Sequence, residues 1–231
     1  MVIILPSKLM GNSIETVFFQ KASVEKNLTG GVKNIVRTIH SRLVSIGMFT
    51  CLLLMIIGPE LFSVVLGSQW STAGVYAQIL APWFFVIFIS SPLGSIFNIF
   101  EKQQVSLRFN VFLLISRIIV LVISGLLQDP ILGLLLLSST GVIFWSWMNF
   151  YLLKIASVSM RDALWDIIRY LVFGIFVCLP LLIAKYYSVS SNLILVIAVV
   201  VTMIYYLVIL YRDTQLRDEL LNIIGINMYK K

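Results

Sequence analysis

Residues 105–127 read VSLRFNVFLLISRIIVLVISGLL, and this stretch decides the class of the fold. A helix needs about 20 mostly apolar residues to cross the hydrocarbon core of a bilayer. The stretch meets that length, and its only charged side chains are Arg108 and Arg117. Its few polar side chains do not make a face wide enough to lie in water, which excludes a surface helix of a soluble domain. The stretch therefore predicts a transmembrane helix.

Five further stretches have similar length and composition. Together with the first they predict six spans, at residues 43–66, 72–100, 105–127, 131–153, 167–184 and 192–211. The whole chain is 60% hydrophobic and only 12% charged, whereas soluble domains are about half apolar and a quarter charged. We therefore expect an all-α fold, a polytopic transmembrane helical bundle without a soluble domain.

The basic residues alternate between the connections. The first, third and fifth connections and the C-terminal tail hold 14 of the 17 lysine and arginine residues, and the even connections hold only Lys185. Connections rich in lysine and arginine face the cytoplasm in membrane proteins. This predicts a basic cytoplasmic loop at residues 20–42, a cytoplasmic tail at 212–231 and a multi-pass membrane protein. The net charge of +7 is then a bias of the loops, and we expect no nucleic-acid partner.

Residues 1–19 allow two interpretations. The first five are apolar, but Pro6 and Lys8 follow directly. A signal peptide has its basic residues before the apolar part, so this order argues against one. A partial seventh span and an interfacial helix both remain open.

The third predicted span carries a polar stripe centred on Arg117. At about 100° per residue, Ser106, Asn110, Arg117, Ser124 and Gln128 fall within about 40° of one another. A charge in the middle of a span costs at least about 2.5–3.5 kcal/mol, which favours a functional role for Arg117. The stripe could line a water-filled cavity that attracts an anion, or it could pack against polar side chains of neighbouring helices.

The second predicted span contains Pro82 and Pro92, which we expect to act as hinges because proline removes a backbone hydrogen bond. Ser91, Ser95 and Asn98 fall within about 60° of one another on a helix. They are further candidates for a cavity or substrate-binding face, with helix packing as the alternative.

The residues favour no enzymatic chemistry. The only histidine is His40, Cys51 and Cys178 lie within apolar runs, and no cluster suggests a metal site or a cofactor. Asp162 and Asp166 are the only paired carboxylates near a membrane surface. An intramembrane transferase would need such a pair, but a hydrated interfacial helix is the simpler interpretation, because Arg161 and Arg169 alternate with the acids.

Two motifs resemble a known family. Residues 17–23 read VFFQKAS, and residues 66–73 read LGSQWSTA, followed by APW at 81–83. Their order and spacing are similar to the second half of bacterial polysaccharide flippases, the Wzx-like branch of the multidrug/oligosaccharidyl-lipid/polysaccharide exporter superfamily. In that family the first motif leads a helix into a cytoplasmic loop, and the second ends a helix at the outer face. Both positions agree with the topology expected from the charges.

The resemblance implies a transporter and not an enzyme. Such proteins move undecaprenyl-diphosphate-linked oligosaccharides across the inner membrane for O-antigen, lipopolysaccharide and other surface polysaccharides. The diphosphate is anionic, so Arg117 in a polar stripe makes physical sense, although the family offers no short binding motif to carry over. Its members have two lobes of helices and this chain resembles only the second, so an N-terminal lobe or another assembly protein is an expected partner, beside membrane lipid. The alternative is a non-transporting membrane subunit that organises a polysaccharide-assembly complex.

Overall fold

The computed structural model describes residues 20, 22–28, 30–214 and 217, and their regular structure is entirely helical. Six helical stretches among them are long and apolar enough to cross a membrane, which confirms the predicted fold class. The predicted segment 1–19 and most of the 212–231 tail lie outside the described residues. The elements are α2 (Lys33–Leu66), η1 (Ser68–Trp70), α3 (Ser71–Ser90), η2 (Ser91–Ser95), α4 (Ile96–Ile99), α5 (Gln103–Leu127), α6 (Pro130–Ile155), α7 (Met160–Tyr186) and α8 (Ser191–Arg212).

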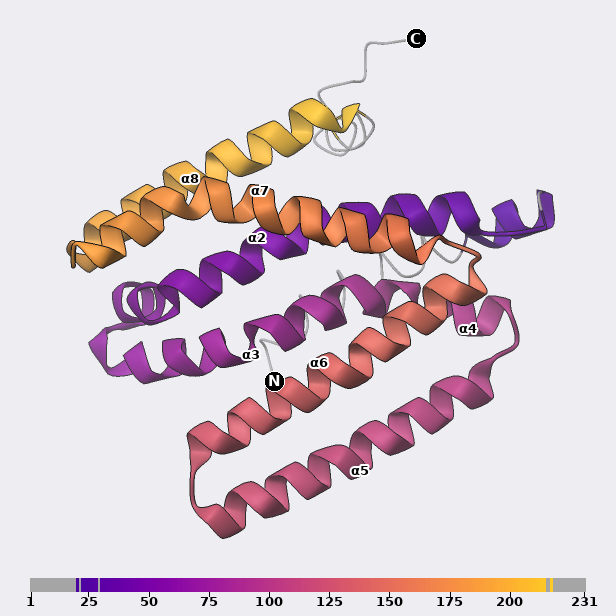
Figure 1. Ribbon diagram of the computed structural model, residues 1–231, viewed down its shortest axis with the longest axis horizontal. Helices are drawn as coiled ribbons and strands as arrows, with labels where there is room; N and C mark the ends of the chain where they lie inside the picture. Colours follow the sequence, from indigo (N-terminus) through magenta and orange to yellow (C-terminus); the bar gives the residue numbers. More distant parts are fainter. Residues whose placement is uncertain (1–19, 21, 29, 215–216, 218–231) are drawn as a thin grey trace.

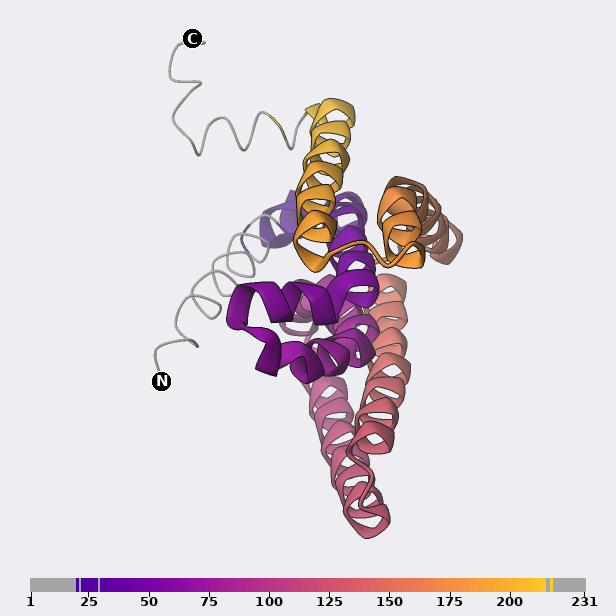
Figure 2. The same ribbon diagram turned by 90° about the vertical axis from the view of Figure 1, so that its left-hand side faces the viewer.

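Helix α2 lies at the centre of the bundle. It packs against α3 on one side and against α7 and α8 on the other, while α6 packs against α3 and α5. The helices run side by side and alternate in direction. The odd connections, which precede α2, α5 and α7, therefore lie at the same end of the bundle, on the right in Figure 1. Figure 2 shows the α5–α6 hairpin projecting away from the rest of the molecule. Helix α5 is therefore the least enclosed of the six spans.

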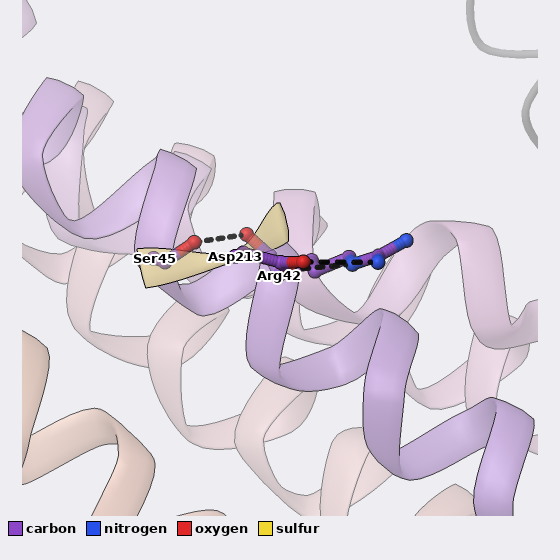
Figure 3. Close-up of polar contacts among 3 residues, drawn as sticks. All are labelled: Arg42, Ser45 and Asp213. Atoms are coloured by element: carbon purple, nitrogen blue, oxygen red, sulfur yellow. Dashed lines mark hydrogen bonds and ion pairs between the residues drawn. The ribbon is translucent and has the colours of Figure 1, made fainter. Parts of the chain in front are cut away.

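Ion pairs join distant parts of the chain at the end that the odd connections share, which we call the basic end. Arg42 of α2 forms a two-pronged contact with Asp213 after α8, with Nε 2.9 Å from Oδ2 and Nη2 3.2 Å from Oδ1 (Figure 3). Arg37 pairs with Asp162 at 3.2 Å. The structure thus groups the basic connections as the charges predicted, and the side of the membrane that they face stays a prediction.

Residues 20, 22–28 and 33–42 are helical, so the predicted basic loop at 20–42 is helical over most of its described length. The hydropathy of a span falls where charges begin, but the helix continues because its apolar positions continue. Val36, His40, Leu43 and Val44 are buried at spacings of one and two turns, while Lys33 lies exposed on the outer face. Helix α7 likewise begins at Met160, seven residues before the span predicted at 167–184.

Aromatic packing fixes α8 against α2. Tyr205 is fully buried, and its ring stacks on that of Phe49 with centroids 4.3 Å apart. Its hydroxyl donates a 2.6 Å hydrogen bond to the carbonyl of Ser45, and the hydroxyl of Ser45 donates to the carbonyl of Arg42 (Figure 3). A tyrosine hydroxyl buried among apolar groups needs such an acceptor, so these contacts define the register between the two helices.

Candidate functional site

Arg117 lies near the middle of α5, half-buried and directed toward α3. Its Cζ atom is 5.4 Å from the ring of Trp83, the distance of a cation–π contact. Among the described residues it pairs with no carboxylate. A guanidinium presents five N–H donors in a planar fork, so Arg117 keeps its capacity to bind an anion.

A glycine makes room for the aromatic platform beneath Arg117. A Cβ atom added to Gly141 of α6 would lie only 2.5 Å from Nε1 of Trp83, so the indole occupies space that any larger residue would fill. Trp83 also stacks on Phe84, with centroids 5.4 Å apart. Nε1 of Trp83 is buried without a hydrogen-bond partner among the described residues. Helices α3, α5 and α6 therefore meet around this indole.

The rest of the α5 stripe is divided between packing and exposure. Ser124 is half-buried, donates to the carbonyl of Asp129 at 3.4 Å and contacts Gly133 of α6. Asn110 is exposed and donates within its own helix to the carbonyl of Ser106. Gln128 lies in the turn after α5, with a left-handed φ of 52°. The stripe thus includes one residue that packs against α6 and two that are exposed, and Arg117 lies between Asn110 and Ser124 along the helix; the water-filled cavity stays a prediction.

The polar residues of the second predicted span do not share a face. Ser95 is buried, with its hydroxyl unpaired among the described residues, whereas Ser91 and Asn98 are exposed. The cause is a change of helix type. Ser91–Ser95 forms a 3₁₀ helix, and Pro92 lies in its first turn. A 3₁₀ helix advances about 120° per residue, so angles calculated for an α-helix no longer hold.

Of the two predicted hinges, only Pro92 coincides with a break. Helix α3 continues through Pro82 as far as Ser90. A second interruption lies in α2 at Ile57, whose φ of −119° and ψ of 18° are not helical. Pro59 explains its position, because proline has no N–H and clashes with the carbonyl four residues earlier, here that of Met55.

Two side chains bind the carbonyls next to this break. Gln78 of α3 donates from Nε2 to the carbonyl of Met55 at 2.7 Å, and Lys185 of α7 donates from Nζ to the carbonyl of Ile56 at 2.6 Å. Lys185 also pairs with Glu60, with Nζ 3.1 Å from Oε1. We call Met55, Ile56, Glu60, Gln78 and Lys185 the kink network. It provides the partners that freed carbonyls need in a membrane.

The kink network also depends on a close approach of two helices. A Cβ atom added to Gly58 would lie 2.6 Å from the carbonyl oxygen of Gly74, and one added to Gly74 would lie 2.5 Å from Cα of Pro59. Small residues allow such backbone contact between transmembrane helices. The pair Gly58–Pro59 is evident in the sequence. No sequence pattern near it indicates that Gly74 and Gln78 of α3 pack against it, so the kink network could not be predicted from the sequence.

His40, expected in a basic loop, is instead buried between α2 and α6. One of its ring nitrogens, Nε2, is 3.3 Å from Oδ1 of Asn149, and both residues are at most 3% exposed. Nδ2 of Asn149 has no partner among the described residues. Because both side chains are buried, this polar pair links the two helices and offers no open site for chemistry.

The structure gives the paired carboxylates of α7 separate environments. Asp162 pairs with Arg37 of α2, whereas Asp166 forms no ion pair among the described residues and interacts only electrostatically with His40 of α2. Within the described part of the chain, no group of three or more histidine, cysteine, aspartate or glutamate residues could hold a metal ion.

In comparisons with protein-family models, with curated proteins and with solved structures, this sequence has no significant match.

Proposed function

We propose that this chain belongs to a transporter that moves an anionic lipid-linked substrate across a membrane, a lipid-diphosphate oligosaccharide being the substrate that fits best. The observation that carries the proposal is Arg117, which lies in the middle of a span and has an aromatic platform but no carboxylate partner among the described residues. Ionisable residues inside a membrane are expensive and mark substrate pathways. A permanent cation at this depth therefore suggests an anionic ligand.

The chemistry of the guanidinium favours a phosphate group over a free inorganic ion. Arginine binds phosphate oxygens with two parallel hydrogen bonds, and the bonds are strongest where water is excluded. A cation–π contact such as that of Arg117 with Trp83 uses the charge of the guanidinium and none of its N–H donors. A diphosphate joined to a lipid would bring its charge to this depth while its chain stays among the exposed apolar side chains of α5.

The interrupted helix α2 supports transport as distinct from a purely structural role. Interrupted helices are common in transporters, where side chains satisfy the carbonyls that the interruption frees. In this chain the break is held by side chains from α3 and α7, two helices that lie on different sides of α2. A relative movement of these helices would change which side chains bind the carbonyls of Met55 and Ile56.

The family resemblance adds the direction and the biological setting to this proposal. The basic end would face the cytoplasm, following the rule for lysine-rich and arginine-rich connections. The substrate would be an undecaprenyl-diphosphate oligosaccharide for a surface polysaccharide, and a second helical lobe would complete the translocation path.

A binding measurement on the purified full chain tests the role of Arg117. We expect Arg117→Gln to weaken the affinity for a detergent-soluble polyprenyl diphosphate about tenfold or more, since a hydrogen bond to a charged group contributes about 1.5–3 kcal/mol. Arg108→Gln, an exposed arginine of the same helix near the basic end, is the matched control and should bind normally. Equal affinity for the Arg117→Gln variant and the wild type would exclude Arg117 from the site.

A further inference from the structure

Helix α7 presents a face of alternating charge and aromatic character that no other helix covers. The side toward α2 and α8 is buried at Ala163, Gly174, Cys178, Leu181 and Ala184. On the other side, Arg161, Trp165 and Arg169 are all exposed, and Trp165 retains 64% of its surface. Figure 2 shows α7 at the margin of the molecule. In a membrane this face meets lipid.

The acidic and basic side chains of α7 have different partners. Asp162 pairs with Arg37 of α2, and both acids are half-buried. Arg161 and Arg169 are exposed, and neither pairs with a carboxylate in the part of the chain that the structure describes. The guanidinium of Arg169 lies 5.7 Å from the ring of Tyr170 and has no other described polar partner. The outer face of α7 therefore carries two uncompensated positive charges.

The two arginines are close enough to act on one headgroup. Arg161 and Arg169 are eight residues apart, which is a rise of about 12 Å along the helix axis, and Trp165 lies midway between them. The Cα–Cβ bonds of a helix tilt toward its N-terminus, so the side chain of Arg169 starts toward the basic end, and its guanidinium lies beside the ring of Tyr170. Long arginine side chains reach the headgroup region in this way.

Below the arginines the same face becomes purely apolar. Val172 is 62% exposed and Phe176 is 69% exposed, and both follow Arg161 and Trp165 at helical spacings that keep them on one face. The order along the face is cation, aromatic ring, cation and then hydrocarbon. It matches the order in a lipid leaflet, where Trp lies at the headgroup boundary.

We propose that this face of α7 binds an anionic phospholipid of the leaflet at the basic end. The lipid phosphate would lie between Arg161 and Arg169, Trp165 would pack at the glycerol level, and an acyl chain would lie along Val172 and Phe176. Charge complementarity selects an anionic headgroup over a zwitterionic one, because a choline ammonium would meet two arginines. The proposal is independent of the transported substrate and of the role of Arg117.

Native mass spectrometry of the full chain, released from nanodiscs of equal phosphatidylglycerol and phosphatidylcholine, tests the proposal. The wild type should retain phosphatidylglycerol in preference. We expect the R161Q/R169Q double variant to lose this preference by about fivefold or more, since each basic residue near an anionic membrane surface contributes roughly that factor. R161K/R169K keeps both charges and should keep most of the preference.

The matched control is R108Q/K154Q, which removes two exposed charges from the same end of other helices. It should leave the preference unchanged. A wild type that retains both lipids equally overturns the proposal. So does an equal loss in both Gln double variants, which would show a general effect of net charge, and so does an unchanged preference in R161Q/R169Q.

Discussion

Lys185 and Glu60 meet beside the break in helix α2, with Nζ of the lysine 3.1 Å from Oε1 of the glutamate and 2.6 Å from the carbonyl oxygen of Ile56. Glu60 is the acid of the first span, and Lys185 is the only base of the even connections. One lysine thus stabilises both a carboxylate and a carbonyl next to an interruption of the helix. This contact connects α7 to the part of α2 that lies beyond the break.

Replacing Lys185 tests this connection. Lys185→Met keeps most of the length of the side chain but leaves Glu60 and the carbonyl of Ile56 without their donor. We expect a loss of about 1 kcal/mol in the free energy of unfolding, the usual size of a polar contact between membrane helices. Thermal unfolding in detergent measures it, with Lys154→Met as the control at an exposed position of the basic end. An equal effect of the two substitutions would show that the contact contributes nothing specific.

Pro59 should determine the shape of α2. In Pro59→Ala an N–H becomes available for the carbonyl of Met55, and the helix can continue through Ile57. A straight helix of 34 residues spans about 51 Å at 1.5 Å per residue, so spin labels near its two ends should move apart. Pulsed electron paramagnetic resonance measures the distance. Pro82→Ala, with labels on α3, is the matched control and should change little, because α3 is continuous at Pro82.

Gly74 should tolerate no side chain. A Cβ atom there would lie 2.5 Å from Cα of Pro59, and backbone cannot move aside as a flexible side chain can. We expect Gly74→Ala to cost about 1–3 kcal/mol, typical of overpacking, measured as a lower unfolding temperature. Gly125→Ala is the control, since nothing lies within 4 Å of its added Cβ. Unfolding temperatures that match the wild type in both variants would contradict the close approach of α2 and α3.

His40 and Asn149 should behave as one unit in a double-mutant cycle. Asn149→Leu leaves a buried ring nitrogen of His40 unpaired, which costs about 1–3 kcal/mol. His40→Phe combined with Asn149→Leu removes both polar groups, so the double variant should be more stable than the sum of the single losses predicts. Strictly additive losses in thermal unfolding would show that the two side chains do not interact.

Hydropathy and charge were sufficient to predict the six spans and the grouping of their connections, because both signals are local to a segment. The same signals placed the start of α2 ten residues late, since polarity marks the edge of the membrane and not the end of a helix. Arg117 could be predicted because a charged residue within an apolar run is evident from the sequence alone. Its contact with Trp83 could not be predicted, because Trp83 belongs to another helix.

The kink network illustrates the same limit. Gly58 and Pro59 predict a weak point in α2, but the donors that satisfy it come from Gln78 and Lys185 on two other helices. The periodicity of the polar residues 91–98 failed for a different reason, since Pro92 changes the type of the helix and with it the angle between successive residues.

The most direct test of the proposed function is the movement of lipid across vesicle membranes that contain the purified full chain. A fluorescent polyprenyl diphosphate is placed in both leaflets, and a reductant that cannot cross the membrane quenches the outer pool. We predict that wild-type vesicles expose the inner pool faster than protein-free vesicles, that Arg117→Gln slows this at least about tenfold, and that Arg108→Gln does not. Movement no faster than in protein-free vesicles, or equal movement with Arg117→Gln, would contradict transport by this chain through Arg117.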